Sequence, residues 1–134
     1  ASLSLMQHGA SVIGVDAARM DRQVLEFSSA EGAKFTHFKM SAGQVLRGLL
    51  PARVDVLVCD LNAAPPVILP IVEKYQKALS ASRFILTMKL GDAEMVGRIP
   101  EFMRRLRRFA PAPVRAVQLA ANRSEFCVVA GGVG

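Results

Sequence analysis

Apolar and polar positions along the chain change period several times, between the spacing typical of a strand and that of a helix. The strands predicted from short apolar runs rich in β-branched residues are 11–16, 34–40, 54–60, 83–89, 114–119 and 125–130. The helices predicted from apolar positions three or four residues apart are 3–8, 19–28, 67–80 and 91–109, the last interrupted at Pro100. A turn at Asn122 and Arg123 is expected to join the last two strands.

Strands and helices alternate with short connections until this closing hairpin. The order is typical of an α/β fold with a doubly wound, mainly parallel sheet and a C-terminal antiparallel hairpin. Ligands of such sheets bind beyond the carboxyl ends of the strands. Asp16, Asp60 and Lys89 each close one of the predicted strands, so we expect all three at that edge.

The composition adds a basic charge to this picture. The chain has 134 residues, enough for one domain over residues 1–134, and 17 Lys and Arg against 11 Asp and Glu give a net charge of +6. This balance favours polyanionic partners such as nucleic acid. Charged residues interrupt every long apolar run, and the N-terminus lacks the basic region of a signal peptide. We therefore expect an intracellular protein without membrane spans, in the cytoplasm first and in an organelle or the nucleus as alternatives.

Cysteine and histidine give no pattern of their own. Cys59 and Cys127 each lie in an apolar strand-like run, which indicates two buried, reduced thiols. Neither they nor the isolated His8 and His37 have the spacing of metal ligands, so we expect no metal site.

The two strand-end acids each permit a functional and an ordinary interpretation. Asp16 closes VIGVD, where an acid of a doubly wound fold accepts hydrogen bonds from the vicinal hydroxyls of a cofactor ribose. That placement serves nicotinamide cofactors and S-adenosylmethionine alike, and the alternative is an acid that caps a helix beginning at Ala17. Asp60 lies between an apolar strand and the loop LNAAPP, a position that would hold it at the floor of a cleft. The alternative is an ordinary strand-end acid that accepts hydrogen bonds from turn amides.

Lys89 follows the apolar run Ile85–Met88, which we expect to be buried. Desolvation lowers the pKa of a lysine and a nearby carboxylate opposes that shift, so Asp60 and Lys89 together predict a tuned proton acceptor. The alternative is a lysine that extends into solvent from the strand end. Glu125, at the entrance to the last strand, is a further candidate, with a solvated turn acid as its alternative.

Four runs, GASVIGVD, VDVLVCDLNAAP, RFILTMKL and VQLAANRSEFCVV, occur in this order over almost the whole chain. The ordered set resembles the FtsJ-like RNA 2′-O-ribose methyltransferases, and most of all the RlmM-type branch, which modifies a cytidine ribose of ribosomal RNA. The resemblance implies a Rossmann-like class I methyltransferase fold. It also implies S-adenosylmethionine as cofactor and ribosomal RNA as the methylated partner.

Members of that family place a lysine, an aspartate, a second lysine and a glutamate around the target hydroxyl. By position Asp60 would be the aspartate, Lys89 the second lysine and Glu125 the glutamate. The resemblance implies that Lys89 helps to deprotonate the ribose 2′-hydroxyl, while the two acids orient it and balance its charge. It assigns the cofactor to Asp16, Asp60 and Ser41, although relatives often carry an acid at Met40–Ser41 to meet the adenine amine.

The family's glycine-rich cofactor loop, the strand before it and the first tetrad lysine have no counterpart in the sequence and would lie upstream of Ala1. That strand is normally paired between the strands that end in Asp16 and Asp60. We therefore expect the chain to be a piece of a longer protein, with the first strand missing from its sheet.

The run MRRLRRF is a candidate surface for RNA. Helical spacing directs Leu106 and Phe109 inward and spreads Arg104, Arg105, Arg107 and Arg108 over the outer side. The alternative is an ordinary solvated helix face. One tyrosine and no tryptophan provide no evident platform for base stacking.

Three other functions remain open at this point. The first is a methyltransferase that acts on another substrate, and the second is a catalytically inactive methyltransferase-like module that binds RNA. The third is a nicotinamide oxidoreductase. The last would leave Asp60, Lys89 and Glu125 without a role.

Overall fold

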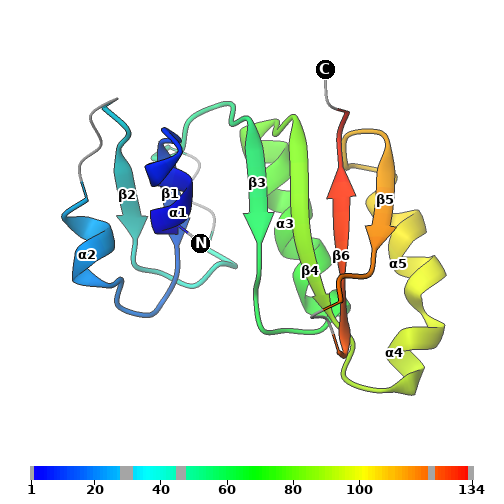
Figure 1. The fold of residues 1–134 in the computed structure, drawn as a ribbon. Helices are drawn as coiled ribbons and strands as arrows, with labels where there is room; N and C mark the ends of the chain where they lie inside the picture. Colours follow the sequence, from blue (N-terminus) through cyan, green and yellow to red (C-terminus); the bar gives the residue numbers. More distant parts are fainter. Residues whose placement is uncertain (1, 28–31, 45–47, 121–122, 133–134) are drawn as a thin grey trace. The chain divides into compact units, whose positions relative to one another are not determined.

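The structure is a computed structural model that describes residues 2–27, 32–44, 48–120 and 123–132 (Figure 1). The chain divides into two compact units, residues 1–45 and residues 46–134, each of mixed α/β structure. The α/β class is therefore confirmed. The expectation of a single domain over residues 1–134 stays a prediction.

Unit 1 contains a two-stranded parallel sheet formed by β1 (Val12–Val15) and β2 (Phe35–Phe38). It is preceded by α1 (Ser2–Gln7), which ends just before Gly9. Gly9 has a φ of 83°, the left-handed conformation that glycine adopts most easily at the end of a helix. The predicted helix with its glycine stop is confirmed, as are both strands.

The helix predicted over residues 19–28 is much shorter in the structure. α2 is the single turn Arg22–Leu25, and Asp21 caps it by accepting a hydrogen bond from the backbone N–H of Gln23. Leu25 is 53% exposed, so little apolar packing is available to stabilise a longer helix. The predicted end at Ser28 lies outside the described residues.

Unit 2 is built on a four-stranded mixed sheet with the order β3 (Val56–Cys59), β4 (Arg83–Lys89), β6 (Glu125–Ala130) and β5 (Val114–Val117). β3 and β4 are parallel, whereas β6 runs antiparallel to both β4 and β5. The predicted C-terminal antiparallel hairpin is confirmed. Of the predicted turn residues, Asn122 lies outside the described residues.

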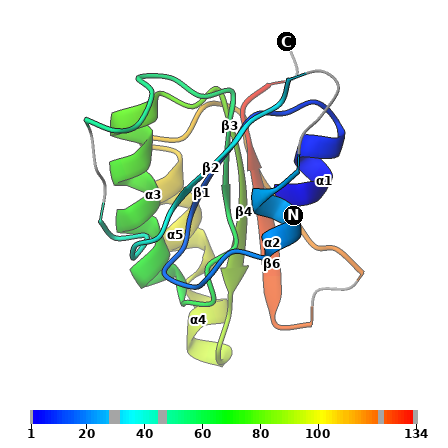
Figure 2. The ribbon, with the colours of Figure 1, turned by 90° about the vertical axis from the view of Figure 1, so that its left-hand side faces the viewer.

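Three helices connect the strands of unit 2, and all lie on the same side of its sheet (Figure 2). α3 (Pro65–Leu79) begins two residues before the predicted start, because proline is tolerated in the first helical turn, where backbone N–H groups have no acceptor. The predicted interruption near Pro100 is confirmed as a break at Arg98 between α4 (Ala93–Gly97) and α5 (Ile99–Leu106). Within the described ranges, no helix has both the length and the apolar character needed to cross a membrane.

The core of unit 2 lies between this helical layer and the facing side of the sheet. Alternate residues of β4 and β6 point into it and are almost completely buried. The strand residues of the core are Phe84, Leu86, Met88, Phe126, Val128 and Ala130, and their main helical partners are Ile68, Leu69, Val72, Phe102, Met103 and Leu106.

The opposite face of the same sheet carries apolar side chains that no element of unit 2 covers in the described residues. Val58, Ile85 and Val129 lie directly opposite one another on β3, β4 and β6 and are 45%, 46% and 41% exposed. We call this side the open face. The prediction that the whole run Ile85–Met88 is buried is therefore wrong for Ile85, because helices cover only one side of the sheet.

Candidate active site

Three of the predicted site residues converge at one end of the open face. Asp60 directly follows β3, and Lys89 is the last residue of the parallel neighbour β4. β6 runs in the opposite direction, so its first residue, Glu125, is the register partner of Lys89. By strand alternation Lys89 and Glu125 point away from the core side chains Met88 and Phe126, toward the open face.

The Lys89 ammonium group lies between the two carboxylates. Its Nζ donates a hydrogen bond to Oε2 of Glu125 at 2.5 Å and lies 3.6 Å from Oδ1 of Asp60. The exposed fractions of the side chains are 32% for Lys89, 26% for Glu125 and 71% for Asp60. We refer to these residues as the acid–lysine trio. Within the trio, Lys89 and Glu125 form a partly buried ion pair, and the Asp60 carboxylate faces solvent.

The trio keeps Lys89 protonated. The hydrogen bond to Glu125 raises the pKa of Lys89 most, the charges of both acids raise it further, and partial desolvation opposes them without reversing the direction. The sequence predicted the same opposing effects and a lysine tuned as a proton acceptor. In the structure the carboxylates prevail, so the resting side chain is an ammonium ion.

The ordinary interpretations of these three residues do not describe their geometry. Lys89 does not simply extend into solvent, since it is held between two acids, and Glu125 is not an isolated turn acid. In the part of the chain that the structure describes, the Asp60 carboxylate accepts no hydrogen bond from a turn amide and forms an ion pair with Lys89.

We predict that Glu125→Gln lowers the pKa of Lys89 toward its ordinary value and that Asp60→Asn lowers it less. The reason is that the hydrogen bond to Glu125 is the largest cause of the shift, whereas Asp60 acts mainly through its charge at a longer distance. Titration of the Lys89 side-chain NMR signals in the three proteins measures this order directly. A larger change in Asp60→Asn would contradict the geometry of the trio.

Unit 1 holds the two remaining predicted site residues. Asp16 directly follows β1, and Ser41 lies three residues beyond β2, so both come after the carboxyl ends of paired parallel strands. The exposed Asp16 carboxylate accepts the backbone N–H of Ala18 through Oδ1 at 2.8 Å. The Ser41 hydroxyl accepts the N–H of Gly43 at 3.4 Å. Asp16 is not a helix cap as the alternative proposed, because the next helix starts at Arg22.

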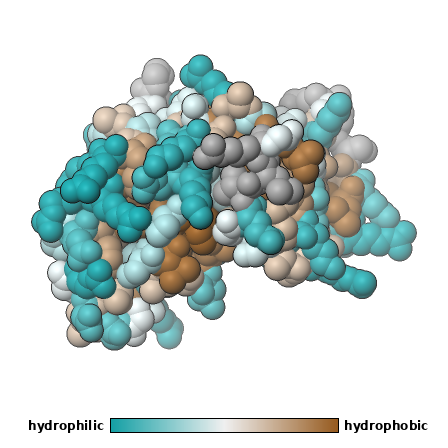
Figure 3. Space-filling view, turned by 180° about the vertical axis from the view of Figure 1, so that it is seen from behind, coloured by the Kyte–Doolittle hydropathy of each residue, from teal (hydrophilic) through white to brown (hydrophobic). Residues whose placement is uncertain are grey.

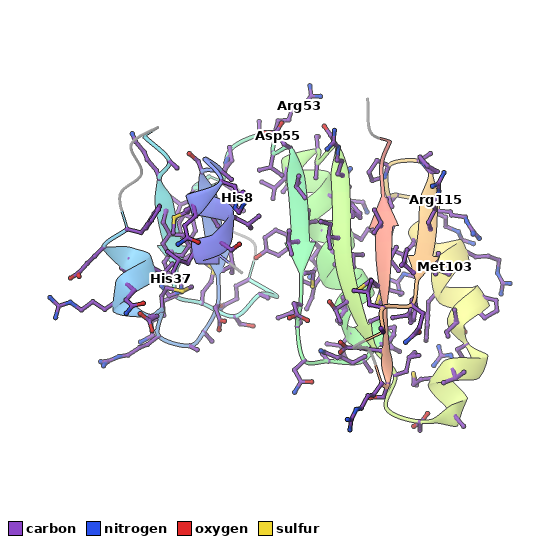
Figure 4. All side chains as sticks on the ribbon, viewed as in Figure 1. His8, His37, Arg53, Asp55, Met103 and Arg115 are labelled. Carbon is purple, nitrogen blue, oxygen red and sulfur yellow. The ribbon has the colours of Figure 1, made fainter. Side chains whose placement is uncertain are left out.

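The two histidines and two cysteines lie on or beside four different elements, α1, β2, β3 and β6. His8 follows α1 and His37 lies on β2, where its Nε2 is 3.3 Å from the backbone oxygen of Asp16 (Figure 4). Cys59 and Cys127 form no disulfide, and both are half-buried rather than fully buried. Burial raises the pKa of the Cys59 thiol, which keeps it in the unreactive protonated form. Among the described residues no three His, Cys, Asp or Glu side chains gather closely enough to hold a metal ion.

No protein-family model matches the chain, and no curated protein matches it either. The resemblance to the FtsJ-like methyltransferases therefore stays a prediction. Sequence reasoning missed one feature beside the trio, the exposed apolar row Val58, Ile85 and Val129. The sequence feature that could have shown it is the continuous apolar run of each strand. Such a run predicts a buried strand but does not say which face of the sheet other elements cover.

Proposed function

We propose that this chain is part of the catalytic domain of an S-adenosylmethionine-dependent RNA methyltransferase with a Rossmann-like sheet, acting on a ribose 2′-hydroxyl of ribosomal RNA. The observation that carries the proposal is the acid–lysine trio. A single ammonium group, held between two carboxylates at adjacent strand ends, can bind a neutral hydroxyl and stabilise negative charge that develops on its oxygen.

The residues of unit 1 fit a cofactor of this kind. The exposed Asp16 carboxylate uses Oδ1 for the Ala18 amide, and its remaining acceptor sites are open to the vicinal hydroxyls of a ribose. Ser41 adds an exposed hydroxyl beyond the neighbouring strand. Its hydroxyl oxygen would accept a hydrogen bond from the adenine amine, but a weaker one than the acid that relatives often carry there. When bound, S-adenosylmethionine supplies a sulfonium methyl group that is already activated for transfer.

We further propose that Lys89 assists as a hydrogen-bond donor. An amine that accepts a proton must first be uncharged, but the neighbouring acids stabilise the charged form of Lys89. Donation from Nζ to the 2′ oxygen lowers the free energy of the alkoxide, and the hydroxyl proton passes to water beside the exposed Asp60 carboxylate. Glu125 holds Nζ in place, and Asp60 orients the hydroxyl.

The cofactor assignment is tested by Asp16→Ala. We expect this change to weaken S-adenosylmethionine binding about tenfold to a hundredfold, because it removes a charged hydrogen-bond acceptor. Isothermal titration calorimetry of the full chain measures it. Asp16→Asn is the matched control, because its amide oxygen preserves the turn to Ala18 without the charge. Unchanged affinity in both variants, or measurable NADH affinity in the unaltered chain, would contradict the proposal and favour an oxidoreductase.

A further inference from the structure

The basic charge of the chain is concentrated in unit 2. Residues 1–45 carry four Lys or Arg and four Asp or Glu, whereas residues 46–134 carry thirteen and seven. The entire net charge of +6 therefore belongs to unit 2. Four of its arginines lie within five positions at the end of α5, namely Arg104, Arg105, Arg107 and Arg108, and we call them the arginine surface.

Internal ion pairs do not account for these arginines. Arg105 lies 3.7 Å from Glu73 of α3, but Glu73 also binds Lys77 at 2.9 Å. Arg104, Arg107 and Arg108 are exposed, and within the described residues they form no ion pair. The charge of Arg104 acts on Glu101, but Glu101 is already paired with Arg98. Arg104 and Arg105 lie in the last turn of α5, where cations are stabilised by the helix dipole, but Arg107 is the C-cap and Arg108 lies beyond it.

Three of the four arginines border a hollow of about 600 Å³ between α3 and α5, which is lined by Glu73, Glu101, Arg104, Arg105, Arg108 and Phe109. Its two acids are already neutralised, Glu73 by Lys77 and Glu101 by two hydrogen bonds from Arg98. These cations lower the pKa of both carboxyl groups, so both acids stay ionised and paired with them. The hollow therefore presents an excess of positive charge, on the side where hydrophilic side chains gather in Figure 3.

The segment that carries the arginines is fixed to the core. Leu106 is fully buried, and the Phe109 ring packs on Phe84 with 6.3 Å between ring centroids. Because Phe109 is engaged there, no aromatic ring of this segment is free to stack on a base. Arg104, Arg107 and Arg108 are three and four positions apart and so share one face. A row of guanidinium groups without a base-stacking ring fits a row of phosphates.

We propose that the arginine surface binds the phosphate backbone of RNA outside the nucleotide that is modified, without sequence preference. This inference rests on the proposed function for its substrate class. α5 covers the sheet side opposite to the open face, so RNA on the arginine surface is remote from the acid–lysine trio. The surface therefore sets affinity for the RNA and leaves the chemical step to the trio.

The test compares the full chain with a triple variant, Arg104→Gln, Arg107→Gln and Arg108→Gln. The probe is a labelled oligouridine of about 20 nucleotides, titrated by fluorescence anisotropy from about 50 to about 200 mM salt. We expect affinity to fall at least about tenfold at the low salt concentration and the log–log salt slope to fall by about two, since each lost phosphate contact removes about 0.7. Circular dichroism checks that the variant is folded.

The matched control removes three positive charges from unit 1, by Arg19→Gln, Lys34→Gln and Lys39→Gln. It should keep the slope of the unaltered chain. Equal slopes in both triple variants would overturn the inference, because binding would then follow net charge alone. Tighter binding of polyglutamate than of oligouridine would also overturn it, in favour of an acidic protein partner.

The same variants separate this inference from the proposed function. If the proposed function is wrong, the arginine variant still loses oligouridine binding although no methyl group is transferred. If the inference is wrong, the arginine variant binds and reacts as the unaltered chain does. If both are right, the variant has a raised KM for RNA and an unchanged kcat.

Discussion

Replacing Lys89 with alanine is expected to lower the rate of the proposed methyl transfer by at least about a hundredfold, with cofactor affinity unchanged within about twofold. The alanine leaves two carboxylates facing the target hydroxyl without the ammonium between them. Negative charge developing on the 2′ oxygen would then meet like charges instead of a hydrogen-bond donor. Single-turnover transfer of a labelled methyl group to RNA measures the rate, and calorimetry measures cofactor binding.

Two further variants make this result specific. Lys89→Arg keeps a permanent cation that donates hydrogen bonds, so it should retain more activity than alanine if Lys89 acts as a donor. A proton acceptor would instead be lost completely with arginine, whose pKa is too high for that role. Lys74→Ala, at an exposed position of α3 without an ion pair in the described residues, is the control for loss of one lysine. Near-normal turnover in Lys89→Ala would end the proposed mechanism.

The strands and the long helices of unit 2 were predictable because their patterns are strong. RFILTMK predicted β4 at its observed limits. Proline fixed both the start of α3 and the break before α5, since it lacks the N–H that helix interiors require. α2 was overestimated because three spaced apolar residues do not guarantee packing, and Asp21 moves the start of the helix.

The site was predictable in its membership but not in its electrostatics. Asp60 and Lys89 follow from the rule that parallel strands end at one edge, whereas Glu125 was a candidate from its place before the last strand and received its role from the resemblance. The pairing of Lys89 with Glu125 depends on the antiparallel register of β4 and β6, which local sequence does not encode. The direction of the Lys89 pKa shift depends on distances of a few ångströms between atoms far apart in sequence, so it required the structure.

The same strand that carries Lys89 provides the largest expected effect on stability, through Phe84→Ala. The Phe84 side chain is fully buried between β4 and the helical layer and contacts Phe109. Its removal leaves a cavity in a core that is otherwise close-packed, and the expected loss is about 3–5 kcal/mol of the free energy of unfolding. Single domains are stabilised by only about 5–15 kcal/mol, so this change approaches the limit that the fold tolerates.

Ile85→Ala is the matched control, because Ile85 is the next residue along β4 but points to the open face and is 46% exposed. It should cost no more than about 1 kcal/mol, since surface substitutions have small effects. Urea unfolding followed by circular dichroism measures both variants, and Phe84→Leu, with a smaller cavity, replaces Phe84→Ala if that variant does not fold. Equal losses at the two positions would show that the open face is covered in solution. The trio at its end would then be closed to RNA in that state, because Lys89 and Glu125 share this face of the sheet.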